Sequence, residues 1–128
     1  MTNLTYADLI WNRACFDEAV SPLAGDCALA DLLKLHGLAM NGGVLHALEC
    51  LHPDEFAAAK SGYRFYAFDD VAEFLESTNS RKNRTGDELS AFEAETNRRY
   101  AELIPRDSVL SDRFEAYLKD NPHEFAPL

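Results

Sequence analysis

The chain has 128 residues, and its 22 Asp and Glu residues outnumber its 12 Lys and Arg residues, which gives a formal net charge of −10. Such a charge repels nucleic acid and anionic membrane surfaces and favours basic protein surfaces as partners. With 47% hydrophobic and 11% aromatic residues, the chain is too apolar to stay unfolded for want of a core. Its length suits one domain, so we expect residues 1–128 to fold as a single unit.

Further features of the sequence favour a cytoplasmic protein. No apolar run reaches about eighteen residues, the length that a membrane-spanning helix needs. The N-terminal stretch carries a carboxylate at Asp8 and lacks the basic head and apolar segment of a conventional signal peptide. The cysteines Cys15, Cys27 and Cys50 are odd in number and show no CxxC spacing. This usage is typical of a reducing compartment and predicts buried thiols.

Two helices are predicted in the first forty residues. Thr5 and Asp8 have the spacing of a capping box, and the apolar residues after them recur at helical intervals until Pro22 ends the run. Asp26 is the predicted N-cap of the second helix. That helix is almost wholly apolar, with leucines at positions 29, 32, 33 and 35, so we expect it to lie in the core.

The residues Asn41, Gly42 and Gly43 predict a sharp turn between the second helix and a short one over 44–51. Two glycines and an asparagine permit the positive φ angles that such a turn needs. The glycine pair follows a helix instead of a strand, which is the wrong context for a phosphate-binding loop. A structural role is therefore favoured over a ligand-binding one.

The next predicted helix begins at Pro53, which suits the first helical position, with Asp54 and Glu55 near the positive end of the helix dipole. It leads into an aromatic cluster over 63–68, which is short enough to form either a helix or a strand. A further helix is expected to begin at Asp69 or Asp70. The polar residues at about 77–85 predict a solvated loop.

Two more helices are predicted after this loop. Thr85 and Glu88 have capping-box spacing ahead of a long helix from Gly86 to Ile104, and a last helix covers 109–119. Phe125 is expected to pack against the body of the domain. No alternating strand pattern of useful length is present. The predicted fold is therefore all-α, a single compact domain of six or seven helices, in which the loop separates an acidic N-terminal part from two C-terminal helices.

No motif in the sequence predicts catalysis. The chain lacks a P-loop, a GxSxG or HExxH motif and a dinucleotide-binding fingerprint, so we expect neither an enzyme nor a bound cofactor. The best metal-binding candidates are His46, Glu49 and Cys50, one helical turn apart, with His36 and His52 as further ligands. Their spacing matches no specific site, and Cys50 among leucines is typical of a small core residue.

Acidic residues recur at helical intervals over 69–76. On a helix, Asp69, Asp70, Glu73 and Glu76 share one surface, called the acidic ridge below. No Lys or Arg occurs between positions 64 and 81 to neutralise this surface, and like charges at such spacing destabilise a helix. A solvated surface selected for solubility is the alternative interpretation. The basic stretch 81–84 is expected to make local charge contacts instead of binding nucleic acid.

The residues from Leu35 to Gly43, which end in Asn-Gly-Gly, resemble the helix–NGG–helix signature of the DNA-mimic protein domain family. The order of later features supports this resemblance, because an aromatic-rich helix pair, a polar gap and a long helix with Tyr100 follow. The closing motif consists of Tyr117, Asn121, Pro122 and Phe125. One departure concerns the residues after the glycines, where family members usually have a Phe-x-x-Phe-Phe pattern and this chain has Val-Leu-His-Ala-Leu.

The resemblance implies an all-helical acidic domain, often dimeric, whose carboxylates imitate the phosphates of duplex DNA. Such a domain occupies a basic DNA-binding protein, for instance a transcription regulator, and blocks it. The Asn-Gly-Gly turn then acts as a fold determinant, and the function resides in the acidic surface. The predicted partner-binding residues are Asp54, Glu55, Asp69, Asp70, Glu73 and Glu76.

Other interpretations fit the same sequence. An immunity protein or antitoxin that neutralises a cationic toxin, such as a nuclease, has the same electrostatics. A metal-binding protein that uses the histidine-containing cluster over 46–52 is a third interpretation, and a structural domain whose charge only confers solubility is a fourth. In the DNA-mimic and the immunity-protein interpretations alike, the partner is a basic protein, and the domain binds neither nucleic acid nor a membrane directly.

Overall fold

The computed structural model describes residues 4–128, which form seven α-helices and one 3-10 helix and contain no strand. This confirms the predicted all-α fold. No helix within these residues combines the length and the apolar character needed to cross a membrane. The helices are α1 (Tyr6–Cys15), α2 (Ala24–Gly42), α3 (Val44–Cys50), α4 (Pro53–Phe65), α5 (Asp69–Ser80), α6 (Gly86–Leu103), α7 (Asp107–Asp120) and η1 (Pro122–Glu124).

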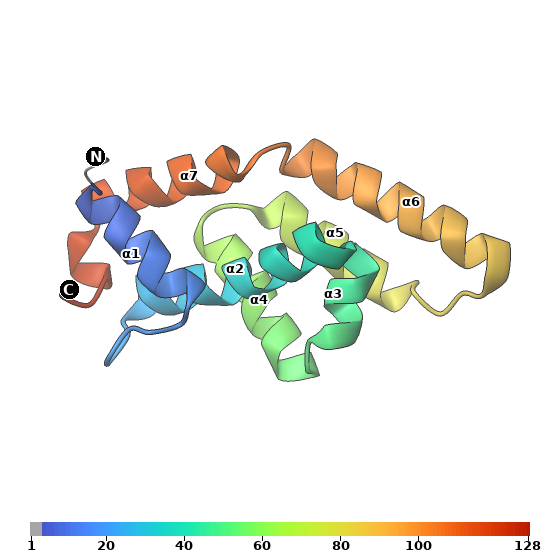
Figure 1. Cartoon of the computed structure of the whole chain (residues 1–128), viewed down its shortest axis with the longest axis horizontal. Helices are drawn as coiled ribbons and strands as arrows, with labels where there is room; N and C mark the ends of the chain where they lie inside the picture. The colour runs from blue at the N-terminus through green and yellow to red at the C-terminus, as the bar shows by residue number, and fades with distance from the viewer. Residues whose placement is uncertain (1–3) are drawn as a thin grey trace.

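Helix α2 is central to the domain and packs against α1, α3 and α4. Helix α4 also contacts α5, and α3 and α5 both contact α6. In Figure 1, α6 and α7 follow one another along one side of the molecule, and the first turns of α6 extend beyond the other helices. Helix α1 and the C-terminal residues lie together at the opposite end (Figure 1).

The leucine-rich part of α2 lies in the core, as its composition predicts. Leu29, Leu32 and Leu35 are at most 1% exposed, whereas Leu33 is half-buried. Helix α4 approaches this surface at Gly62, where an added Cβ atom would lie 2.4 Å from the backbone oxygen of residue 28. The two helices therefore meet backbone to backbone, which only a glycine at position 62 permits.

Aromatic side chains fill the space between α4 and the C-terminal segment. The cluster over 63–68 forms the last turn of α4 and the connection to α5, and Tyr63 and Tyr66 are fully buried. The ring of Phe125 lies 5.7 Å from that of Phe114 and is only 4% exposed. This confirms that Phe125 packs against the body of the domain, where aromatic burial stabilises the fold.

Two predicted boundaries differ from the structure. Helix α5 continues to Ser80, so the predicted loop is wrong over its first four residues and the connection covers only 81–85. Hydroxyl groups in this polar stretch donate hydrogen bonds to backbone carbonyl oxygens of the same helix. The Thr78 hydroxyl, for example, donates to the carbonyl oxygen of Phe74 at 2.8 Å. Helix α1 ends at Cys15, well before Pro22, and Asp17 follows with a φ of 51° that no helix accommodates.

The two predicted capping boxes have different outcomes. The first is confirmed, because the Thr5 hydroxyl accepts the Asp8 amide at 3.1 Å and the Asp8 carboxylate accepts the Thr5 amide at 3.0 Å. The second is wrong. Thr85 is the N-cap of α6, but its side chain makes no capping hydrogen bond. The Glu88 carboxylate instead accepts a hydrogen bond from Arg84 at 2.8 Å.

Asp26 is not an N-cap but the third residue of α2, and it is only 4% exposed. Its carboxylate accepts three hydrogen bonds, from the Leu23 amide at 3.0 Å, from Arg13 Nη2 at 2.7 Å and from the Ala126 amide at 2.7 Å. Arg13 in turn donates to the carbonyl oxygens of Ala126 and Pro127, both at 3.0 Å. This buried ion pair joins α1, the start of α2 and the C-terminal residues.

The turn at Asn41, Gly42 and Gly43 is present, although only Gly43 has a positive φ, of 96°. Asn41 and Gly42 are still helical, so of the three residues that permit a positive φ only Gly43 adopts one. Gly43 ends α2 and precedes α3. The side chain of Asn97 on α6 accepts the amide of Val44 at 2.9 Å and holds the turn against α6.

Replacing Gly43 with valine is expected to lower the free energy of unfolding by roughly 2 to 3 kcal/mol, because a β-branched residue is strained at this φ. A Cβ atom at position 43 would also lie 3.1 Å from the Asn97 amide. Gly86→Val is the matched control, since Gly86 has a φ of 61° and no neighbour within 4 Å. Urea denaturation should show the larger loss for Gly43→Val, and equal losses would mean that the Asn97 contact is unimportant.

Candidate functional site

The acidic ridge lies on the outer surface of α5, as the spacing of its residues predicts. Asp69, Asp70, Glu73 and Glu76 are all exposed. The opposite surface of the helix is buried in the core, with Val71, Ala72 and Leu75 completely inaccessible to solvent. The packed surface fixes the position of the helix, so the carboxylates are presented on a rigid element.

The ridge is not free of cations, because Glu76 forms an ion pair with Lys60 of α4. The hydrogen bond from Lys60 lowers the pKa of the Glu76 carboxyl group. The expectation of an entirely unneutralised ridge is therefore wrong, since it considered only cations that are neighbours in sequence. No ion pair involves Asp69, Asp70 or Glu73 among residues 4–128.

The other two predicted partner-binding residues, Asp54 and Glu55, lie at the start of α4 and line a separate cavity. Pro53 is the first helical residue there, and the Glu55 carboxylate accepts the amide of His52 at 2.9 Å. Glu55 also forms an ion pair with Lys34 of α2. Hydrogen bonds from Lys34 and from the His52 amide lower the pKa of Glu55. Of the six predicted residues, two are thus paired with lysines.

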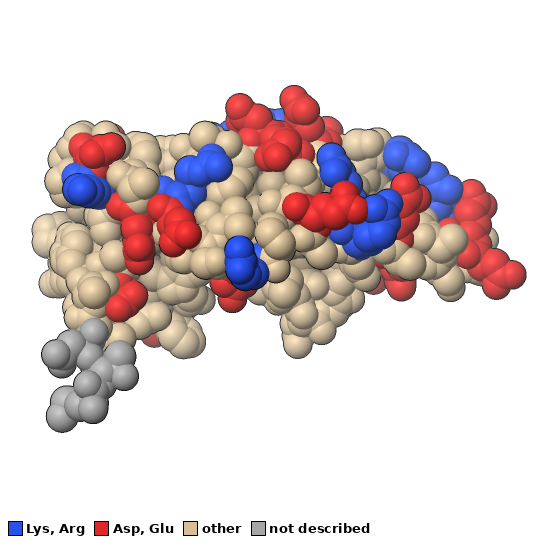
Figure 2. Space-filling view, turned by 90° about the horizontal axis from the view of Figure 1, so that it is seen from above, with Lys and Arg blue, Asp and Glu red and all other residues tan. Residues whose placement is uncertain are grey.

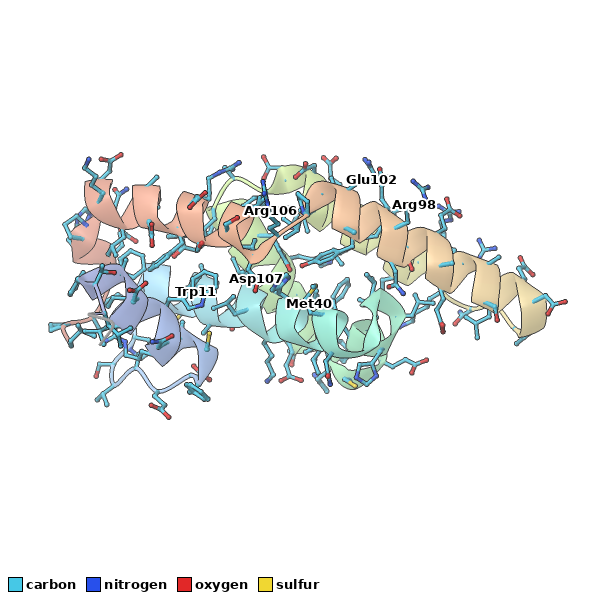
Figure 3. All side chains as sticks on the ribbon, turned by 45° about the horizontal axis from the view of Figure 1, so that its top comes forward. Trp11, Met40, Arg98, Glu102, Arg106 and Asp107 are labelled. Atoms are coloured by element: carbon cyan, nitrogen blue, oxygen red, sulfur yellow. The ribbon has the colours of Figure 1, made fainter. Side chains whose placement is uncertain are left out.

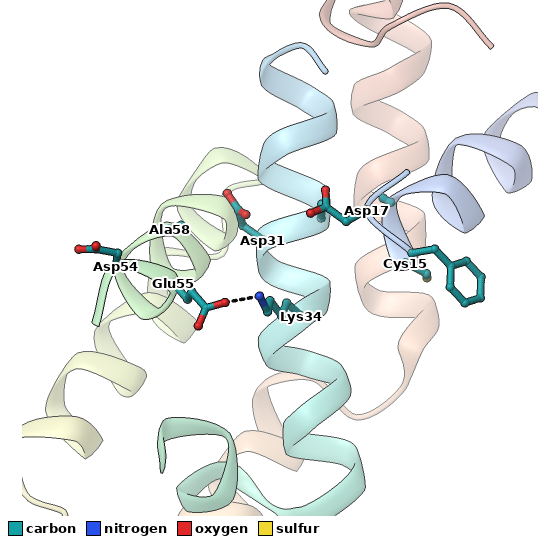
Figure 4. Close-up of a pocket in the computed structure, with 10 residues that line it drawn as sticks. Cys15, Asp17, Asp31, Lys34, Asp54, Glu55 and Ala58 are labelled. Atoms are coloured by element: carbon teal, nitrogen blue, oxygen red, sulfur yellow. Dashed lines mark hydrogen bonds and ion pairs between the residues drawn. The ribbon is translucent and has the colours of Figure 1, made fainter. Parts of the chain in front are cut away.

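This cavity, called the acidic hollow below, has a volume of about 390 Å³ and lies between the end of α1, α2 and α4. Its carboxylates belong to Asp17, Asp31, Asp54 and Glu55, and Figure 4 shows them around the Lys34–Glu55 pair. Partial burial and the neighbouring Asp17 carboxylate raise the pKa of Asp31.

Sequence reasoning missed the acidic hollow because its walls come from distant segments. Asp17 follows α1, Asp31 lies in the middle of α2 and Asp54 begins α4. The exposed ring of Phe16 adds an aromatic surface at the edge of the hollow, at 72% exposure. Only the tertiary packing of α2 with α1 and α4 brings these side chains together, so no sequence spacing could reveal them.

The candidate metal ligands are not brought together. Within the described residues, no group of three or more His, Cys, Asp and Glu side chains could hold a metal ion. His46 and Cys50 are in contact, with Cys50 Sγ at 3.6 Å from His46 Nε2. His52 instead caps α4, where its Nδ1 accepts the Asp54 amide at 3.3 Å.

His36 is buried and has a different role from the one considered for it. Its Nε2 lies 2.8 Å from the Asp107 carboxylate and its Nδ1 lies 2.7 Å from the Tyr100 hydroxyl. That hydroxyl lies 2.6 Å from the hydroxyl of Tyr63, and burial raises the pKa of both tyrosines. Every polar group of this chain has a partner when Nε2–H of His36 donates to Asp107, Tyr100 donates to Nδ1 of His36 and Tyr63 donates to Tyr100. The network joins α2, α4, α6 and α7.

The cysteines contradict the prediction of buried thiols, because Cys15, Cys27 and Cys50 are all exposed. In α3 the buried positions are taken by Leu45 and Leu48, which leaves Cys50 on the outer surface. Partial burial and the Asp107 carboxylate raise the pKa of the Cys15 thiol. A raised thiol pKa is the opposite of what a nucleophilic cysteine requires.

Acidic and basic side chains are interleaved on the surface seen from above α6 and α7 (Figure 2). On α6, for example, Arg98 and Arg99 both contact Glu102. Figure 3 shows Arg98 and Glu102 on the same outer side of that helix. This surface is therefore not a uniform acidic track, and the candidate acidic sites are the ridge on α5 and the hollow beside α4.

Comparison of the chain with family models, with curated proteins and with solved structures found no match. Any function therefore has to be inferred from the charges, the burial and the geometry of the described residues. Three surfaces stand out by their charge. They are the ridge, in which three exposed carboxylates form no ion pair within residues 4–128, the acidic hollow, and the mixed-charge surface of α6.

Proposed function

We propose that the domain is an acidic protein-interaction module, resembling a DNA mimic, which binds a basic nucleic-acid-binding protein and blocks its nucleic-acid site. The observation that carries this proposal is the presence of Asp69, Asp70 and Glu73 on the exposed surface of α5 without an ion pair in the described part of the chain. Their charges are held in place by a helix whose other surface is completely buried.

The physical basis of the proposed binding is the release of counterions from the basic partner. A nucleic-acid-binding protein carries arginine and lysine side chains that meet phosphates, and it gains free energy from the release of small ions. Carboxylates on a rigid helix supply a similar array of negative charge and form charge-assisted hydrogen bonds with the same side chains. Such binding is strong at low salt and weakens steeply as salt is added.

The test is capture of proteins at low salt from a lysate of the source organism, followed by elution with duplex DNA. We expect the captured proteins to be DNA-binding proteins, because duplex DNA competes for their basic sites. The triple variant Asp69→Asn, Asp70→Asn, Glu73→Gln should reduce capture by about tenfold, since each carboxylate contributes a charge-assisted contact. Quantitative mass spectrometry measures the captured amount.

A matched variant controls for net charge. Asp112, Glu115 and Asp120 of α7 are also exposed, and no ion pair involves them among residues 4–128. Changing them to Asn, Gln and Asn removes the same amount of charge and should leave capture within about twofold of the unchanged protein. Equal losses for the two triple variants would contradict the proposal. Capture of a toxic nuclease instead of a transcription regulator would identify an immunity protein.

A further inference from the structure

The basic residues of this acidic chain are concentrated in one region. Five of its twelve Lys and Arg residues lie between positions 81 and 99. They come from the loop over 81–85 and the second half of α6, and α6 packs against α5. Three of them, Arg81, Arg98 and Arg99, line a cavity of about 210 Å³, called the arginine pocket below.

An aromatic ring supports one side of the arginine pocket. Phe92 is only 5% exposed, and its ring lies below two guanidinium groups. The Cζ atom of Arg81 is 5.5 Å from the ring centroid, and that of Arg84 is 4.4 Å from it. Such stacking holds a guanidinium group in place while its N–H groups stay available at the edge. No aromatic residue lies within the stretch 81–84 itself, and Phe92 reaches it through the packing of α6.

The arginine side chains of the pocket carry more N–H donors than there are carboxylate acceptors beside them in the described residues. Arg81 forms no ion pair within residues 4–128. Arg98 and Arg99 share a single carboxylate, that of Glu102, and the Arg99 Nη1 atom lies 3.2 Å from it. Each guanidinium group carries five N–H donors, so one shared carboxylate leaves most of them without a protein acceptor.

We propose that the arginine pocket binds a compact oxyanion of the phosphate class, such as a diphosphate or a small phosphomonoester. Guanidinium groups recognise phosphate oxygens through paired hydrogen bonds, and the three arginines line the cavity from the loop after α5 and from α6. The cavity is smaller than the roughly 300–1,000 Å³ of pockets that hold drug-sized ligands, which favours a small ligand. A nucleic acid strand is disfavoured by the net charge of −10.

One feature of the pocket opposes anion binding and provides a sharp test. Glu95 lines the cavity together with the three arginines, and its carboxylate repels an anion. Removing this charge should strengthen binding, whereas removing an arginine should weaken it. A surface that attracts anions only through its general field would respond equally to the same charge changes made outside the cavity, whereas a defined site responds mainly to those that line it. The proposed site does not depend on the function of the acidic ridge.

The experiment is isothermal titration calorimetry of the full chain with inorganic diphosphate at low salt. We expect saturable binding that weakens by about tenfold or more in the double variant Arg81→Gln, Arg99→Gln. The control is Arg64→Gln, Arg106→Gln, which removes the same charge outside the pocket and should change Kd by less than about twofold. Far-UV circular dichroism establishes that each variant is folded.

A second pair of variants keeps the result interpretable if the arginine variant is unstable. Glu95→Gln should tighten diphosphate binding by several-fold, whereas Glu93→Gln, on the same helix but outside the pocket, should have little effect. The proposal is overturned if diphosphate does not bind saturably, if the control arginine variant loses as much affinity as the pocket variant, or if the two glutamate variants bind alike.

Discussion

Replacing Gly62 with alanine is expected to lower the free energy of unfolding by about 3 kcal/mol. The new Cβ atom would lie 2.4 Å from the backbone oxygen of Ala28, where ordinary contacts measure 3.4–4 Å. A backbone oxygen inside α2 cannot rotate away as a flexible side chain can, so the two helices must separate. Their separation would loosen the packing of Leu29 and Leu32, which are almost completely buried.

The control for this prediction is the same substitution at Gly37, which is exposed on α2 and has no atom within 4 Å of the added Cβ. Gly37→Ala should stabilise the protein by about 0.5 to 1 kcal/mol, because alanine loses less backbone entropy in a helix. Urea denaturation followed by circular dichroism measures both variants. If Gly62→Ala were as stable as Gly37→Ala, the backbone contact between α2 and α4 would be wrong.

Replacing Asp26 with alanine is expected to destabilise the fold by about 3 to 5 kcal/mol, because it leaves the buried guanidinium group of Arg13 without its counter-charge. The change also removes the acceptor of the Leu23 and Ala126 amides. The C-terminal residues should then detach more readily, so limited proteolysis should cleave them sooner. Both effects follow from a carboxylate that is only 4% exposed and accepts three hydrogen bonds.

Asp31→Ala is the control for the Asp26 variant. Asp31 lies on the same helix, is half-buried and takes part in no ion pair among the described residues. Its alanine variant should change the free energy of unfolding by no more than about 0.5 kcal/mol. A double-mutant cycle with Arg13→Met measures the coupling between Arg13 and Asp26 directly. A coupling near zero would show that the pair does not stabilise the domain.

Much of the fold could be predicted because helix signals are local. Pro53 followed by two acids marks the start of α4, and the Thr5–Asp8 pair marks the start of α1. These local signals give a wrong prediction where a side chain that could cap a helix forms its hydrogen bonds with a distant part of the chain instead. Asp26 resembles an N-cap in sequence, yet its carboxylate is used by Arg13 and by an amide at the other end of the chain. Polar residues up to Ser80 stay helical because Thr78 faces the core.

The candidate sites could be predicted only as far as they lie on one helix. The ridge on α5 follows from a helical period, and its exposure is as expected. The lysine that neutralises Glu76 lies 16 residues away on α4, and the one that pairs with Glu55 lies 21 residues away on α2. Helix packing decides such contacts, and sequence spacing carries no information about it. The arginine pocket escaped prediction for the same reason.

The contact between Asp26 and Ala126 has a consequence for the order of folding. The two residues are 100 positions apart, so Asp26 is synthesised long before the amide that it binds. A contact between positions so far apart in sequence has a large loop-closure entropy, which slows its formation during folding. Arg13 can pair with Asp26 as soon as α1 and α2 meet, whereas two further acceptors of its guanidinium group come from residues 126 and 127. The ion pair between Arg13 and Asp26 therefore gains its full set of hydrogen bonds only when residues 126 and 127 pack against it.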